Sequence, residues 1–432
     1  MSAIVAVHGR RVWDSRGFPT IEVEVRLESG AVGRAIAPAG ASRGSREALD
    51  LRDGGPRLRG RDVRHALRRV EDVVAPALVG REPQPQEEID ALLRELDPTP
   101  DCRILGGNVL TATSLAVLHA AAREADRPLW RHVAETFGTE PSLPLPEIQI
   151  FGGGAHAGRR LDIQDLLVMV PGAASFDEAL EVTAEVYHAA GDLLARSGRL
   201  CGVADEGGWW PAFSSNEEAL ETLVAAIELA GERPGGRVWI ALDVAASEFG
   251  RNGRYRLALE GRELDSAAMV DLVAGWVDSW PIAAVEDPLA EDDRAGWAEL
   301  TARIGDRVQL VGDDLLVTRA GLVREAAASG LCNAALLKVN QVGTVSGMLE
   351  AFRAARTAGF GTIVSARSGE SEDVSIAHLA VGLGAGQLKV GALARSERGA
   401  KWNEVLRIAE DPAAGPFVGR RPLRGAAAGA RT

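Results

Sequence analysis

The first third of the chain alternates apolar with polar positions and then changes to a helical spacing. Three stretches follow a period of two, which predicts β-strands: IVAVHGRRVWD at 4–14, TIEVEVRLESG at 20–30 and AVGRAIAP at 31–38. Two later stretches carry apolar side chains three and four positions apart, which predicts helices, at 62–80 and 108–126. Together these patterns favour an α+β domain over residues 1–138.

A proline-rich stretch, GTEPSLPLPEI at 138–148, predicts the connector to a second domain. Beyond it, short apolar runs alternate with helical stretches, as in a parallel sheet with crossover helices. The runs are VWIALDVA at 238–245, IAAVEDPL at 282–289, VQLVGDD at 308–314, AALLKVNQ at 334–341, GTIVSARSG at 361–369 and GQLKVGAL at 386–393.

Each run ends in polar or charged residues, and the last five of these ends recur about every 25 residues, the length of one strand plus one helix. A TIM-like barrel builds its active site from groups at such strand ends. We therefore expect an α/β barrel over residues 139–416. The remaining segment, 417–432, is small, basic and aperiodic, which predicts a disordered tail.

Composition narrows the functional classes. At 432 residues, 46% hydrophobic and 25% charged, the chain is typical of a globular protein with two domains. It has no bilayer-length apolar run and too short an N-terminal apolar stretch for a secretory signal, so we expect a cytoplasmic protein with no membrane partner. The scattered Cys102, Cys201 and Cys332 suit a reducing compartment. The net charge of −13 disfavours nucleic acid as a partner, although local cations can still bind a small anion.

Lysine is rare: of the 48 basic residues only Lys338, Lys389 and Lys401 are lysines. A GC-rich genome drifts from lysine to arginine wherever charge alone matters. Arginine cannot release its proton at working pH, whereas a buried lysine can act as a base. Lys338 and Lys389, both at strand ends, are therefore candidate catalytic residues. The alternative explanation is that these two lysines have been retained by chance.

Three carboxylates, those of Asp243, Glu286 and Asp313, also end predicted strands. If they converge at one barrel mouth, an all-oxygen set without His or Cys suits Mg²⁺. Any one of these carboxylates taken alone could instead cap the start of a neighbouring helix. A metal beside a lysine base fits removal of a proton next to a carboxylate, because cations must neutralise the enolate-like species that forms.

Motifs in order along nearly the whole chain resemble those of enolases. They are WDSRGFPTIEVEV, GASRGSREALDLRD, DIQD, DEGG, ALDVAASEF, VEDPL, VGDDLLVT, LLKVNQVGT, RSGESED and GQLKVGALARSER. The resemblance implies an enolase-type modified TIM barrel with irregular opening units and an N-terminal α+β capping domain. It also implies a hydro-lyase acting on a small anionic substrate, two Mg²⁺ per active site, and a homodimer or higher homo-oligomer.

The resemblance assigns roles to individual residues. Asp243, Glu286 and Asp313 would bind the first Mg²⁺, and Ser42 would bind a second. Lys338 would be the base, and Glu206 would be the acid that protonates the departing hydroxyl. Around the substrate, Lys389 would bind its carboxylate, Arg367 and Ser368 its phosphoryl group, His156 would close over it, and Gln164 and Asp165 would line the site. Enolases carry Glu at the position of Asp165.

The departures from enolase surround the substrate. The enolase loop Ser-Gly-Ala-Ser-Thr-Gly reads AGASRG at 39–44, which introduces Arg43, and Ser-His-Arg-Ser-Gly-Glu reads SARSGE at 365–370, which replaces a histidine by Ala366. The pair Trp209-Trp210 stands at the aromatic position after DEGG. A retuned substrate explains these changes: Arg43 could pair with an added carboxylate, and Ala366 could leave room for it.

Carboxyphosphonoenolpyruvate synthase, which acts in phosphinothricin-type phosphonate antibiotic biosynthesis, is an enolase-like activity that fits this description. Three alternatives remain open within enzymes: a housekeeping enolase converting 2-phosphoglycerate to phosphoenolpyruvate, an enzyme for another modified glycerate, and a racemase or sugar-acid dehydratase of the wider superfamily. From a different class, the chain could be a binding protein that has lost catalysis. The metal, base and acid positions that the chain keeps argue against that last reading.

Overall fold

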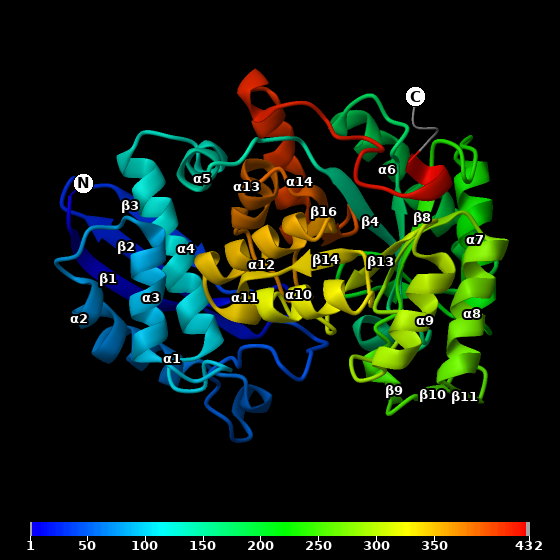
Figure 1. Cartoon of the computed structure of the whole chain (residues 1–432), viewed down its shortest axis with the longest axis horizontal. Helices are drawn as coiled ribbons and strands as arrows, with labels where there is room; N and C mark the ends of the chain where they lie inside the picture. The colour runs from blue at the N-terminus through cyan, green and yellow to red at the C-terminus, as the bar shows by residue number, and fades with distance from the viewer. Residues whose placement is uncertain (1, 429–432) are drawn as a thin grey trace.

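The computed structural model describes residues 2–428, apart from the side chains of residues 156, 426 and 428. A smaller N-terminal part, blue to cyan in Figure 1, lies beside a larger part in which helices surround a central sheet. The N-terminal elements are β1 (Ile4–Trp13), β2 (Pro19–Leu27), β3 (Val32–Ile36), α1 (Arg64–Arg69), α2 (Ala75–Leu78), α3 (Gln86–Leu96), α4 (Gly107–Glu124) and α5 (Leu129–Phe137). The three predicted strands form an antiparallel sheet in the order β1-β2-β3, which confirms the α+β pattern.

Helix α4 is the centre of the N-terminal part. It is buried on nearly every side and packs against β2 and β3. The approach is close: a Cβ added at Gly33 of β3 would lie 2.1 Å from the carbonyl oxygen of Ala116. Only glycine fits there, so this contact fixes the distance between helix and sheet.

Eight strands close the barrel. They are β4 (Leu145–Gly152), β5 (Asp165–Met169), β8 (Trp239–Asp243), β12 (Ile282–Glu286), β13 (Gln309–Gly312), β14 (Ala334–Leu337), β15 (Gly361–Ser365) and β16 (Gly386–Gly391). Their order is β16-β15-β14-β13-β12-β8-β5-β4, and β16 also pairs with β4. Strand β5 runs antiparallel to both neighbours, whereas the others run parallel. The predicted modified TIM barrel with an irregular opening is therefore confirmed.

The proline-rich stretch is only partly a connector, because its second half already belongs to β4.

Outside the barrel wall, short strands form two hairpin regions: β6 (Leu200–Val203) and β7 (Trp209–Pro211), then β9 (Gly250–Arg251), β10 (Arg254–Leu257) and β11 (Arg262–Asp265). Strands β6 and β7 extend the sheet beyond β4.

The outer helices are α6 (Phe176–Arg196), α7 (Asn216–Leu229), α8 (Ser266–Ser279), α9 (Arg294–Ile304), α10 (Ala320–Ala328), α11 (Val339–Val342), α12 (Val345–Thr357), α13 (Ser375–Gly382) and α14 (Ser396–Ala409). Several of the outer helices, α6, α7, α8, α9 and α12, begin at a polar side chain that caps the first turn. Ser175 and Ser215 accept hydrogen bonds from the amides of Glu178 and Glu218, the S-x-x-E arrangement that favours a helix start. Among the described residues, no helix is both long and apolar enough to cross a bilayer.

The prediction of a disordered tail is wrong for residues 417–427. Val418, Leu423 and Ala427 are buried in a cluster with Leu145 of β4. The sequence does not predict this packing, because the apolar side chains are too irregularly spaced to form a helix or strand pattern. Only the barrel floor offers these side chains a surface to pack against. Residues 429–432 lie outside the described part of the chain.

Candidate active site

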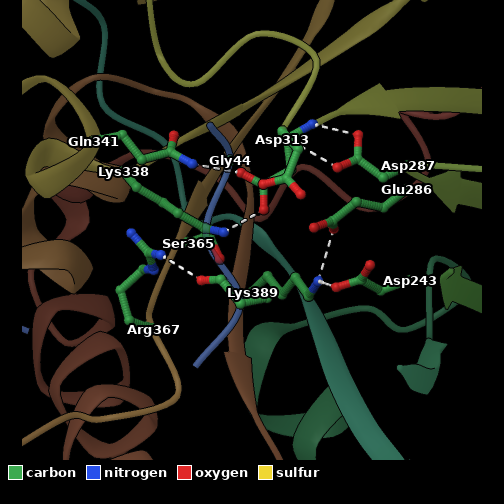
Figure 2. A network of polar contacts seen from close by, with 12 residues as sticks. Gly44, Asp243, Glu286, Asp287, Asp313, Lys338, Gln341, Ser365, Arg367 and Lys389 are labelled. Carbon is green, nitrogen blue, oxygen red and sulfur yellow. Dashed lines mark hydrogen bonds and ion pairs between the residues drawn. The ribbon is translucent and has the colours of Figure 1, made fainter. Parts of the chain in front are cut away.

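The strand ends bring the predicted carboxylates to one mouth of the barrel (Figure 2). Asp243 and Glu286 are direct partners on the parallel strands β8 and β12, and Asp313 follows the next strand, β13. Ser365 and Lys389 are likewise partners on β15 and β16. Asp243, Glu286 and Ser365 are the last residues of their strands, Asp313 directly follows β13, and Lys389 lies near the end of β16. The barrel therefore places their side chains close together at one mouth.

Lys389 joins two of the three carboxylates. Its Nζ lies 2.7 Å from Asp243 Oδ2 and 2.7 Å from Glu286 Oε2. Burial lowers the pKa of the Lys389 amine, but the Asp243 and Glu286 carboxylates outweigh burial and hold that pKa well above its ordinary value. Burial and then the Asp243 charge raise the pKa of Glu286. One ammonium group thus compensates two buried carboxylates only in part.

Lys338 is bound to the third carboxylate. Its Nζ lies 2.5 Å from Asp313 Oδ2, and Gln341 donates to Asp313 Oδ1 at 2.8 Å. Burial lowers the pKa of the Lys338 amine, yet the Asp313 carboxylate outweighs it and the net shift is upward. Burial also raises the pKa of Asp313, and Lys338 and Arg367 reverse this so that the net shift is downward. In this arrangement Lys338 is held as a cation.

A second carboxylate group lies next to Asp313. Oxygens of Asp287, Asp313 and Asp314 all lie within 4.8 Å of one another. However, Asp287 accepts the backbone amides of Asp313 at 2.9 Å and Asp314 at 2.7 Å. Both of its oxygens are therefore occupied in bracing the turn after β13, and we interpret it as structural.

The predicted ligands fit a hard cation. Glu286 Oε1 and Gln164 Oε1 are buried with no hydrogen-bond partner among the described residues. The three carboxylates Asp243, Glu286 and Asp313 also exceed the two lysines that neutralise them. Among the described side chains that line the cavity there is no His or Cys. Unsatisfied buried oxygens and surplus negative charge are the conditions that Mg²⁺ relieves.

Arg367 stands at the other end of the cavity. Its Nη1 lies 2.9 Å from Glu47 Oε2 and donates to Asn340 at 3.1 Å, and its Nη2 donates to the backbone carbonyl of Ser42 at 3.1 Å. The side chains of Arg367 and Glu47 are only 4% and 2% exposed. Glu47 belongs to the N-terminal part of the chain, so this buried ion pair joins the two parts across the site.

The remaining predicted residues have mixed placements. Those that line the cavity with the lysines are Ser42, Gln164, Asp165, Glu206, Asp243, Ala366, Arg367 and Ser368. Gln164 donates to Asp243 Oδ2 at 3.1 Å, Gln149 donates to Asp165, and the Ser368 hydroxyl accepts the Ala41 amide at 3.1 Å. The cavity measures about 20 Å³, because the lysine–carboxylate pairs fill it. The side chain of His156 lies outside the described residues.

The two substitutions expected to favour a new substrate behave differently. Ala366 lines the cavity beside Arg367, as expected. Arg43 is exposed, donates to the Ala48 carbonyl at 2.9 Å and does not line the cavity. The expected contact between Arg43 and the substrate site is therefore absent from this arrangement. A long side chain in a loop can bind a nearby carbonyl as well as a ligand, and sequence cannot decide between them.

Sequence reasoning missed the residues that hold Arg367 and Asp313 in place. Glu47 lies in the stretch REALD at 46–50 and Gln341 in KVNQ at 338–341, and no spacing rule marks either residue. Lys401 is a third case: it is fully buried, and its Nζ lies 3.0 Å from Glu370 Oε2, while Glu370 accepts the Arg367 amide at 2.9 Å. The rarity of lysine in the sequence is the signal that could have marked Lys401.

Comparison with protein families agrees with this geometry. The family model described as "Enolase, N-terminal domain" matches residues 4–133, and "Enolase, C-terminal TIM barrel domain" matches residues 140–424. Together the matches cover nearly the whole chain, and enolase family members use Mg²⁺ and act on small anionic substrates. The chain therefore belongs to the enolase family and is a magnesium-dependent hydro-lyase of the enolase type.

Proposed function

We propose that this enzyme removes water from a 2-phosphoglycerate-like acid, with Lys338 as the base and Glu206 as the acid. Lys338 would take the proton from the carbon next to the carboxylate, and Glu206 would protonate the departing hydroxyl. The two come from different elements, the end of β14 and the β6–β7 hairpin, so they can approach the substrate from separate sides. The observation that carries the proposal is that both line one cavity with Asp243, while Asp313 and Glu286 contact the two lysines of that cavity.

The other residues would bind and orient the substrate. Lys389 would hold the carboxylate, and Arg367 with Ser368 the phosphorus group. Asp243, Glu286 and Asp313 would bind one Mg²⁺, and Ser42 would help to hold a second. A bound Mg²⁺ would supply positive charge beside the substrate carboxylate, and positive charge near Lys338 would lower the pKa of that amine. His156 would close over the substrate, and Gln164 and Asp165 would line it.

For the substrate we propose a glycerate with a phosphorus group larger or more anionic than phosphate, as in carboxyphosphonoenolpyruvate synthesis for phosphinothricin-type antibiotics. The supporting observation is Ala366. It lines the cavity beside Arg367 and Ser368, where enolases carry histidine, so it leaves more room at the phosphorus end. Ordinary 2-phosphoglycerate is the second candidate, and the position of Arg43 favours it, because Arg43 offers no charge to the cavity in this arrangement.

Paired steady-state kinetics on 2-phosphoglycerate and its carboxyphosphono analogue tests the choice. We expect kcat/KM to favour the analogue by more than about tenfold, and Ala366→His to reverse the preference by crowding. Arg43→Thr is the companion variant: a selective loss on the analogue would mean that Arg43 reaches the substrate when the loop closes. Ordinary turnover of 2-phosphoglycerate, with Ala366→His affecting both substrates alike, would contradict the specialised assignment.

We also propose a cytoplasmic homodimer. The free cysteines Cys102, Cys201 and Cys332 support a reducing compartment. Val5 and Trp13 of β1 are about half exposed on the outside of the N-terminal sheet, which supports a subunit contact there. Light scattering of the purified protein would give the mass of the assembly, and a monomer would contradict the dimer.

A further inference from the structure

A groove of about 1000 Å³ crosses the floor of the barrel, at the end opposite the lysines. It lies at the beginnings of β15 and β16 and beside the segment that enters β4. Strand β15 runs from Gly361, in the groove, to Ser365, in the catalytic cavity, a rise of roughly 13 Å. A ligand in the groove would therefore not overlap with the substrate.

Four arginines line this groove. Arg353 and Arg356 come from the last turns of α12, and Arg421 and Arg424 come from the tail, red in Figure 1. Within the part of the chain that the structure describes, Glu140 is the only residue with a carboxylate in the lining. Among the described residues none of the four arginines makes an ion pair. The tail arginines make only long hydrogen bonds to carbonyls, from Arg421 to Val418 at 3.3 Å and from Arg424 to Gly359 at 3.4 Å.

Some surface arginines elsewhere on the barrel have acidic partners. Arg303 lies 2.5 Å from Asp271, and Arg307 lies 2.8 Å from Asp278. Four arginines without such partners gather in one groove of a chain whose net charge is −13, which concentrates positive charge there. Arg356 lies in the last turn of α12, where the helix dipole favours a positive charge whether or not a ligand binds. The tail arginines lie outside any helix, so the dipole does not explain their presence.

The tail is also built into the groove by packing. Val418 and Leu423 are buried in the barrel floor, and the two arginines lie close to them in the chain. The buried apolar residues therefore anchor the segment that carries the cations. A tail needed only to cover the barrel floor would not have to present guanidinium groups into a concave surface.

We propose that this groove binds a small oligophosphate anion. Guanidinium groups match phosphate oxygens through paired hydrogen bonds, and several of them favour a ligand with more than one phosphate. The volume is that of a small-molecule site. A long nucleic acid would leave the groove and meet the negatively charged remainder of the protein, which disfavours it.

The test is calorimetric titration of the full chain in chelator with inorganic triphosphate and, separately, with ATP. We expect both to bind, because the phosphates carry the interaction. Arg421→Ala/Arg424→Ala should weaken binding by about tenfold or more, and so should Arg353→Ala/Arg356→Ala. In the second pair neither side chain makes a hydrogen bond or ion pair within the described part of the chain, so this variant should fold normally. Arg303→Ala/Arg307→Ala is the matched control and should bind like the wild type.

Three results would overturn the proposal. One is a wild type that does not bind triphosphate, and another is equal affinity in the wild type and both groove variants, which would place any binding in the catalytic cavity. The third is a single-stranded oligonucleotide that binds more tightly than triphosphate and depends on the same arginines. The groove variants should also keep the wild-type turnover, so failure here is distinguishable from failure of the proposed reaction.

Discussion

The buried ion pair between Arg367 and Glu47 fixes the position of the guanidinium group that we propose as a substrate ligand. Glu47 Oε1 also accepts the Gly44 amide at 3.1 Å and lies 3.2 Å from Gln341 Nε2. It therefore joins Arg367 to the loop at 39–44 and, through Gln341, to Asp313. Burying a guanidinium is tolerated only while its charge is balanced.

We expect Glu47→Gln to destabilise the protein by on the order of 3 kcal/mol, because it leaves Arg367 as a buried charge without its counter-ion. Inorganic phosphate should restore more stability to this variant than to the wild type, since the anion replaces the lost carboxylate. Thermal unfolding with and without phosphate measures both effects.

The matched control is Glu135→Gln, which breaks the exposed pair with Arg131. It should cost less than about 1 kcal/mol and show no extra response to phosphate. Equal melting temperatures for the two variants would mean that Glu47 does not balance Arg367.

At the residue scale, the sequence predicts where a side chain lies when its place at the end of a strand decides this. It does not predict where a side chain lies when the choice of rotamer decides it. Asp243, Glu286 and Lys338 could be placed because the barrel fixes the direction in which a strand-end residue points. Arg43 could not, because a long flexible side chain in a loop has several partners within reach. Glu47 could not either, because its partner lies more than 300 positions away in the chain.

At the scale of elements, a polar chain crosses the interior of the barrel between β4, β16 and β13. Gln387 donates to Glu147 at 2.5 Å, and Gln309 donates to Gln387 at 2.7 Å. Glu147 is buried, and burial raises its pKa to about 7, against the opposing effect of Lys389. Its protonated form is therefore favoured in the folded protein at mildly acidic pH.

This shift predicts a pH-dependent stability. The pKa of Glu147 is higher in the folded state than its ordinary value of 4.5. The carboxyl group's contribution to the free energy of unfolding is therefore fully present below pH 4.5 and is lost as the pH rises through about 7. Glu147→Gln should mimic the protonated form and be more stable than the wild type at pH 8, by up to roughly 3 kcal/mol. Near pH 4 the two should be similar.

Urea unfolding across this pH range measures the difference, and the exposed substitution Glu350→Gln serves as the control. A Glu147→Gln variant that is less stable than the wild type at pH 8 would show that the carboxylate is held in its charged form, which the burial argument excludes.

Elements whose signals are local could be predicted, and those that depend on a distant surface could not. The S-x-x-E caps at Ser175 and Ser215 mark helix starts within a few residues. The prolines at 141–146 suggested a connector, although β4 begins among them, because a barrel strand can tolerate proline when its neighbours do not need that amide. The ordered tail depends on Leu423 packing against the barrel floor, which no local pattern reveals.

On the scale of the whole molecule, neither part of the chain makes the site alone. The N-terminal part contributes Ser42 and Glu47, and the barrel contributes Arg367 and the carboxylates. An antiparallel bridge between Ala39 and Gly369 joins the two beside the cavity. Anything that binds between the carboxylates therefore acts on the stability of the whole structure.

We expect Mg²⁺ to raise the melting temperature of the wild type by a few degrees, because it binds the folded carboxylate set in preference to the unfolded chain. Asp243→Asn should remove most of this response, while Asp271→Asn, an exposed substitution, should keep it. An equal response to Mg²⁺ in wild type and Asp243→Asn would mean that the ion binds elsewhere, for example at Asp287 and Asp314.

The most direct test of the central claim is exchange of the substrate proton with solvent deuterium at the carbon next to the carboxylate, followed by NMR in the presence of Mg²⁺. If Lys338 is the base, the wild type exchanges this proton, and Lys338→Ala does not. Lys338→Arg should be nearly as inactive as Lys338→Ala, because arginine keeps the charge but cannot accept a proton at working pH. Glu206→Gln should still exchange while failing to release water, since it lacks only the acid. Exchange that survives in Lys338→Ala would contradict the account.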